Sequence, residues 1–152
     1  MPYTVKRILV ATDFSESSAK ASDVGAELAR ATQASLTLLH VVDYYPIYAY
    51  AFEPPSDLLS QLEAAAGVSL EKELARVRAQ SPAVTAALKT GITSDVILTF
   101  VADDATDLLV VGTHGRRGVQ RWLLGSVAEK LVRLCQRPVL TVHGARDREP
   151  KG

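Results

Sequence analysis

The sequence predicts an α/β fold built on a single open, doubly wound sheet of five parallel strands with helices on both faces. Short continuous apolar runs alternate along its 152 residues with longer segments whose apolar residues recur at helical spacing. The apolar runs are not polar at every second position, which is typical of parallel strands covered on both sides. A repeated strand–helix alternation implies parallel strands joined by right-handed crossovers, and the length fits one domain with one core.

The first two strands enclose a helix. The run VKRILVA predicts a strand over residues 5–11, and SLTLLHVV predicts a second strand over 35–42. Between them, Ser15 is the expected N-cap of a helix. The apolar face of that helix is formed by residues four or three apart, namely Ala21, Val24, Leu28 and Ala31.

Prolines and tyrosines interrupt this alternation over residues 43–56, where we expect a surface loop. A long helix follows from Leu58 and ends near Ser81. We predict the remaining elements in this order: a weak strand over 83–89, a turn at Gly91, a short helix around 96–101, a strand over 107–112, a helix from Ser126, and a strand over 138–143. Residues 1–144 are then one domain, and 145–152 form a polar, flexible tail.

Composition excludes several classes of protein. The 17 basic residues are balanced by 17 acidic ones, whereas a nucleic-acid-binding protein would show a basic surplus. No apolar run is long enough to span a bilayer, and the first residues lack the features of a signal peptide, so we expect a cytoplasmic protein. The single cysteine, Cys135, permits no intrachain disulfide and no cysteine-based zinc site, and we expect a buried, reduced thiol.

The most informative stretch is GTHGRRGVQRWLLGS, which follows the fourth predicted strand and has the spacing G-x₂-G-x₉-G-S. It matches neither the phosphate loop G-x-x-x-x-G-K-[ST] nor the dinucleotide fingerprint G-x-G-x-x-G. Glycines that permit close backbone approach, followed by a helix N-terminus, can still hold an anion. Ligands of such sheets bind beyond the carboxyl ends of the strands. If the strand order is 3-2-1-4-5, Asp13 after the first strand faces this loop.

This spacing, together with ILVATDFS near the start and PVLTV near the end, resembles the universal stress protein family from about Lys6 to His143. The resemblance implies the strand order 3-2-1-4-5, a homodimer and, in the branch with this motif, bound ATP. It implies phosphate and ribose contacts from Gly112, Gly115, Gly125 and Ser126. It also implies adenine or ribose contacts from Asp13 and Val41, with Val127 beside the sugar and phosphates.

Several of these residues also have a purely structural interpretation. Asp13 could bond backbone N–H groups in the turn after the first strand. Ser126 opens SVAE, a sequence that predicts a capping box with Glu129 and would engage the serine hydroxyl. His40 fits a core or edge position, and His114 could contact a phosphate. The sequence assigns no metal ligands, although ATP can bring Mg²⁺ and Asp13 offers a nearby oxygen.

The sequence therefore favours an ATP-binding signalling module. A slow ATPase is the alternative, but no base or Walker-type lysine is evident; a dimeric adaptor without nucleotide is a second alternative. We expect residues 138–143 to form an edge strand that pairs two copies in a homodimer, with Val142→Asp shifting it toward monomer. A monomer whose edge is shielded by the charged tail is the other possibility.

Overall fold

The computed structural model describes residues 2–44, 57–114 and 124–144. In these ranges the chain forms one five-stranded parallel sheet in the order β3-β2-β1-β4-β5. The strands are β1 (Arg7–Ala11), β2 (Ser35–Val42), β3 (Val84–Thr90), β4 (Leu108–Gly112) and β5 (Val139–Val142). The helices are α1 (Glu16–Thr32), α3 (Leu58–Arg78), α4 (Thr93–Asp103) and α5 (Ser126–Leu134). The predicted fold class and strand order are confirmed.

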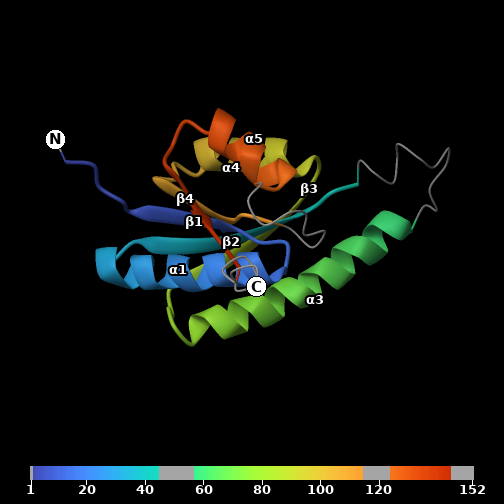
Figure 1. Ribbon diagram of the computed structural model, residues 1–152. Helices are drawn as coiled ribbons and strands as arrows, with labels where there is room; N and C mark the ends of the chain where they lie inside the picture. The colour runs from blue at the N-terminus through green and yellow to red at the C-terminus, as the bar shows by residue number, and fades with distance from the viewer. Residues whose placement is uncertain (1, 45–56, 115–123, 145–152) are drawn as a thin grey trace, which may run out of the picture.

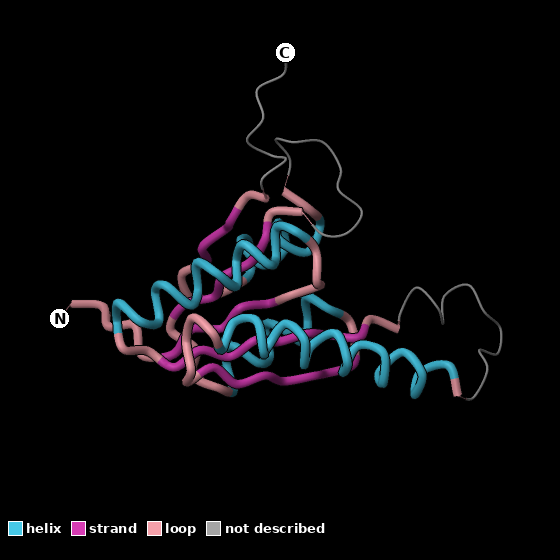
Figure 2. The backbone as a smooth tube through the Cα atoms, turned by 90° about the horizontal axis from the view of Figure 1, so that it is seen from below, coloured by secondary structure: helices cyan, strands magenta, loops and turns pink. Residues whose placement is uncertain are grey.

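Helices cover both faces of the sheet. Helices α1 and α3 lie on one face and α4 and α5 on the other (Figure 1); seen from below, α1 and α3 lie across the strands that they cover (Figure 2). Neighbouring residues of β1 serve opposite cores, because Val10 packs with the α1 and α3 side and Leu9 with the α4 and α5 side. Both side chains are at most 1% exposed, which explains why residues 8–11 of this strand are all apolar.

The turn that leads from β3 into α4 depends on Gly91. Its φ of +153° is a conformation that residues with a side chain rarely adopt. A Cβ atom added there would lie 2.7 Å from Cγ2 of Val96 in the helix that follows. The glycine therefore lets α4 begin immediately above the carboxyl end of β3.

At the edge of the sheet where the strands begin, hydrogen bonds connect β1 to β4. Oδ2 of Asp107 accepts hydrogen bonds from the backbone N–H groups of Lys6 (2.8 Å) and Arg7 (2.9 Å). The backbone oxygen of Asp107 also accepts from the hydroxyl of Tyr3 at 2.6 Å. These contacts join the starts of β1 and β4 and leave the opposite, carboxyl edge as the open side.

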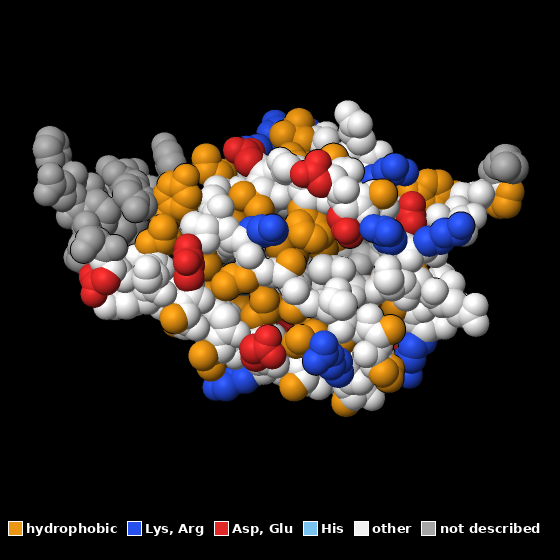
Figure 3. Space-filling view, turned by 180° about the vertical axis from the view of Figure 1, so that it is seen from behind, with side chains coloured by type: hydrophobic (Ala, Val, Ile, Leu, Met, Phe, Trp, Pro, Cys, Tyr) orange, Lys and Arg blue, Asp and Glu red, His pale blue; other side chains and the backbone are white. Residues whose placement is uncertain are grey.

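The surface carries charges of both signs. Lys and Arg side chains alternate with Asp and Glu over the face shown in Figure 3, without a single-sign patch among the described residues of that face. This distribution agrees with the zero net charge of the chain. In the described ranges, no helix is both long and apolar enough to cross a membrane.

Candidate functional site

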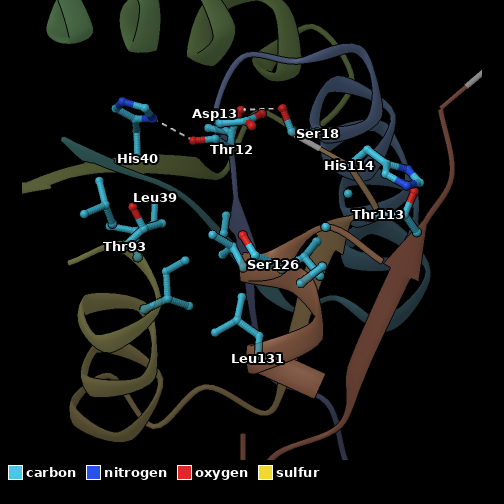
Figure 4. Close-up of a pocket in the computed structure, with 18 residues that line it drawn as sticks. Thr12, Asp13, Ser18, Leu39, His40, Thr93, Thr113, His114, Ser126 and Leu131 are labelled. Atoms are coloured by element: carbon cyan, nitrogen blue, oxygen red, sulfur yellow. Dashed lines mark hydrogen bonds between the residues drawn. The ribbon is translucent and has the colours of Figure 1, made fainter. Parts of the chain in front are cut away.

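A pocket of about 460 Å³ opens at the carboxyl edge of the sheet, where β1, β2 and β4 end (Figure 4). Its walls come from the ends of these strands and from the first turns of α1, α4 and α5. Apolar side chains form one part of the wall, including Leu39, Ile97 and Leu131. Polar groups form the rest, including Thr12, Ser18 and Ser126. The volume lies within the range of small-molecule and cofactor sites, roughly 300–1,000 Å³.

The pocket brings together residues that the sequence places far apart. All the predicted contact residues within the described ranges line it, namely Asp13, Val41, Gly112, Gly125, Ser126 and Val127. Gly115, which the family motif also implies, lies outside the described residues.

The turn after β1 is held by its own side chains. Oγ1 of Thr12 accepts a hydrogen bond from Phe14 N (3.1 Å), and Oδ1 of Asp13 accepts one from Ser15 N (3.0 Å). Phe14 adopts a φ of +65°, which is uncommon for a residue with a side chain. The structural role considered for Asp13 is therefore real, and the same residue also lines the pocket.

Gly112, the last residue of β4, is required for packing. A Cβ atom there would lie 2.5 Å from Oγ of Ser17 and 2.8 Å from the backbone N of Ser18. Such distances are far below van der Waals contact, so any other residue would displace the start of α1. The sequence analysis explained Gly112 by a ligand that approaches its backbone closely. The structure adds a second reason, because the start of α1 also lies close to this backbone.

The two ends of the glycine-rich segment meet at the pocket. The backbone N–H of Gly125 donates to the carbonyl of Thr113 at 2.6 Å, and Thr113 N donates to Val142 O at 2.9 Å. The carbonyl of His114 accepts a short hydrogen bond from the hydroxyl of Ser17. The end of β4 and the start of α5 are thus tied to one another, although residues 115–123 between them lie outside the described ranges.

The predicted capping box at α5 is wrong. Gly125 is the N-cap and makes no side-chain capping bond, and Ser126 is the first helical residue. Glu129 N donates to the carbonyl of Gly125 at 2.9 Å, so the helix begins one residue earlier in register than a serine cap requires. Glycine is nearly as acceptable as serine at an N-cap. As a result Ser126 is exposed at the pocket, beside the positive end of the helix dipole.

His40 and Thr93 also line the pocket, and the sequence did not assign either to a site. Nδ1 of His40 lies 2.7 Å from the carbonyl of Thr12, and its ring packs against Phe14 with centroids 4.4 Å apart. His40 is half-buried on β2, an interior strand of the sheet, and supports the turn after β1, close to the core position expected for it. Its place two residues before the carboxyl end of an apolar strand could have indicated the pocket.

The electrostatic character of the described wall is modest. Asp13 is the only carboxylate among the described lining residues, and neither lysine nor arginine occurs among them. No group of three or more His, Cys, Asp or Glu side chains within the described ranges could hold a metal ion. Cys135 is free and half-buried just after α5, rather than fully buried as expected.

Comparison with known proteins identifies the family. A model of the universal stress protein family matches residues 4–143. The chain belongs to this family. Among curated relatives, it is 30% identical over 138 residues to the universal stress protein MJ0531 of Methanocaldococcus jannaschii, covering 90% of this chain and 81% of that protein.

Solved structures of the family share the fold of this universal stress protein. UspA from Lactobacillus plantarum superimposes with a TM-score of 0.79 at 25% identity, over 93% of this chain and 99% of that one. A family protein from Arabidopsis thaliana, solved with AMP bound, superimposes with a TM-score of 0.67 at 25% identity, over 96% of each chain.

Proposed function

We propose that this universal stress protein binds an adenine nucleotide, ATP, in the pocket at the carboxyl ends of β1 and β4. The observation that carries the proposal is the convergence of Asp13, Val41, Gly112 and Ser126 on one cavity of about 460 Å³. A related structure with AMP bound supports the class of ligand. In the cell we expect this binding to occur in the cytoplasm and to serve a stress response.

The wall of the pocket suggests how the ligand lies. The apolar part, with Val41, Ile97 and Leu131, suits the flat face of the base. The start of α5 suits the phosphates, because the N–H groups of its first turn point out of the helix and its dipole favours negative charge. The exposed hydroxyl of Ser126 adds a donor at that end.

We favour a binding role over hydrolysis, with nucleotide occupancy acting as a signal. Stabilising charge at a γ-phosphate usually takes a lysine, an arginine or a metal clamp, and the described wall supplies no cation. If Mg²⁺ accompanies the triphosphate, Asp13 is the carboxylate that could contact it, since Mg²⁺ sites often combine one carboxylate with phosphate oxygens.

Equilibrium binding of labelled ATP to the purified protein tests the proposal. We expect saturable binding well below millimolar ATP, and Ser126→Ala to weaken it roughly tenfold, as for a lost hydrogen bond to a charged group. Ser60→Ala is the matched control, because Ser60 is another exposed serine in the first turn of a helix, α3, and does not line the pocket. Absence of binding below millimolar ATP would overturn the proposal.

Single-turnover phosphate release distinguishes the slow ATPase from the binding module. Release at background level that is unchanged by Asp13→Ala agrees with binding alone. Release above background that Asp13→Ala abolishes would assign hydrolysis to this pocket instead.

We further propose that two copies associate through the edge strand β5. This strand pairs with β4 on one side and lies at the end of the described sheet. Val142, expected to be at the contact, is only 7% exposed and packs in the α1-side core, whereas Leu140 is 37% exposed. Leu140 is therefore the residue whose substitution tests the interface.

A further inference from the structure

The hydroxyl group of Thr93 donates its hydrogen to another residue of the protein. Thr93 is the first residue of α4, whose N-cap, Ile92, makes no side-chain capping bond. Asp43, just after β2, takes over this role: its Oδ2 accepts hydrogen bonds from Thr93 N at 3.2 Å and from Thr93 Oγ1 at 2.9 Å. A carboxylate fifty residues earlier in the chain thus determines which way the hydroxyl hydrogen points.

This arrangement leaves Thr93 able only to accept further hydrogen bonds. A hydroxyl has one hydrogen to donate and two lone pairs. Bonds to a carboxylate are roughly twice as strong as those between neutral groups, so a neutral ligand does not readily draw the hydrogen away from Asp43. Thr93 lines the pocket, so its oxygen is an acceptor that this residue can offer to a ligand in that part of the cavity.

Thr93 borders the part of the pocket that suits a base. Ile97 lies four residues later, on the same face of α4, and also lines the pocket. Figure 4 shows Thr93 on one side of the pocket, Thr113 and His114 after β4 on the opposite side, and Ser126 at the start of α5 between them. The acceptor is therefore next to apolar wall and opposite the end of β4, where the glycine-rich segment begins.

We infer that Thr93 selects the base of the nucleotide, favouring a purine with an amino group at position 6 over one with a carbonyl oxygen there. The amino group donates to Thr93 Oγ1, whereas a carbonyl oxygen would face another acceptor. A buried polar group left without a partner lowers affinity more than a made bond raises it. The inference rests on the proposed nucleotide-binding function and adds to it the residue that excludes 6-oxopurine nucleotides.

The test compares ATP with inosine triphosphate, which has the same sugar and phosphates but a 6-oxo base. We expect the wild-type protein to bind ATP at least about tenfold more tightly. Thr93→Val, which keeps the shape but removes the hydroxyl, should reduce this ratio by about fivefold or more. Thr93→Ser should restore it, and Thr99→Val, an exposed position on the same helix outside the pocket, should leave it unchanged.

Failure of this inference is distinguishable from failure of the proposed function. If ATP binds but inosine triphosphate binds equally well, or if Thr93→Val keeps the wild-type ratio, Thr93 does not select the base while nucleotide binding stands. If neither nucleotide binds the wild-type protein, the proposed function fails and the inference with it. Thermal unfolding of each variant verifies that a changed ratio comes from a folded protein.

Discussion

At the scale of single residues, buried threonine hydroxyls differ in how well they are satisfied. Thr12, 4% exposed, accepts from Phe14 N and shares a hydrogen bond of 3.1 Å with the hydroxyl of Ser18. Thr106 is 1% exposed, and its Oγ1 has no hydrogen-bond partner among the described residues. Thr106 therefore lowers stability by the cost of desolvating a hydroxyl that gains nothing in return.

We predict that Thr106→Val stabilises the protein by about 1 kcal/mol, because a methyl group replaces an unpaired hydroxyl of similar shape. This corresponds to a rise of about 2–4 °C in Tm for a chain of this size. The same substitution at Thr12 should destabilise by about 1–3 kcal/mol, because it removes the acceptor of Phe14 N and one of the hydrogen bonds of the Ser18 hydroxyl. Urea unfolding measures both; a loss of stability in Thr106→Val would show that its hydroxyl is bonded.

The sequence predicted which residues gather at the site better than it predicted their local roles. Gly112 lies where the backbone passes close to the start of α1, a place that is restricted to glycine. The capping box failed because Ser126 and Gly125 are both acceptable caps, and a shift of one residue changes which one is chosen. N-cap preference alone does not decide between two adjacent residues that are nearly equally acceptable as caps.

At the scale of secondary-structure elements, Arg76 fastens α3 to α1. Its Nη1 donates to Oδ1 of Asp23 on α1 at 2.6 Å, its Nη2 donates to Oε1 of Glu73 at 2.6 Å, and Nη2 also bonds the carbonyl of Ala19 at 3.2 Å. The hydrogen bond that Arg76 donates to Glu73, aided by the one it donates to Asp23, raises the pKa of Arg76 above its already high usual range. The guanidinium stays charged at any physiological pH.

We predict that Arg76→Ala lowers the free energy of unfolding by about 1 kcal/mol, a modest value because the ion pair is partly solvated and screened. Lys72→Ala, which removes an exposed cation one turn earlier on α3, is the control and should change stability by less than about 0.5 kcal/mol. Unfolding measured in low and high salt tests whether the effect is electrostatic. The difference in free energy of unfolding between the two variants should become smaller as the salt concentration rises. An equal loss in both variants would mean that Arg76 adds no specific link.

Element positions were predictable to the extent that apolar pattern determines them. Strand β2 has the predicted bounds, because most of its residues are buried between two layers of helices and form a continuous apolar run. Helix α3 ends at Arg78, three residues before the predicted end, in a part of the chain where exposed residues give no periodicity. The contact between Asp43 and Thr93 could not be predicted, since it depends on strand order and on the turn at Gly91.

At the scale of the whole molecule, the amino and carboxyl edges of the sheet differ in structure. The amino edge is fixed by hydrogen bonds from Asp107 to the start of β1. The carboxyl edge collects three strand ends and three helix starts around one pocket. In a parallel sheet every strand end lies at the same edge and each following helix begins there, so residues that are distant in sequence become neighbours at this edge.

The same topology leaves β5 as an edge, and this leads to a prediction about assembly. Leu140 on β5 is 37% exposed. On the other face of the sheet, α5 carries two further exposed apolar side chains, Val132 (46%) and Leu134 (48%). Unpaired strand edges with apolar side chains invite pairing with another chain, and a two-fold axis would place each strand against its twin. We therefore predict that the protein sediments at twice its monomer mass of 16.3 kDa.

Leu140→Asp should shift sedimentation toward the monomer while the protein stays folded, because a carboxylate at the symmetric contact would meet its copy across the axis. Val68→Asp is the control, an exposed apolar side chain on α3 at the opposite end of the sheet, 59% exposed. The dimer should survive that change. A dimer that persists in Leu140→Asp but dissociates in Val68→Asp would place the interface on the β3 side, since the sheet has an open edge there as well.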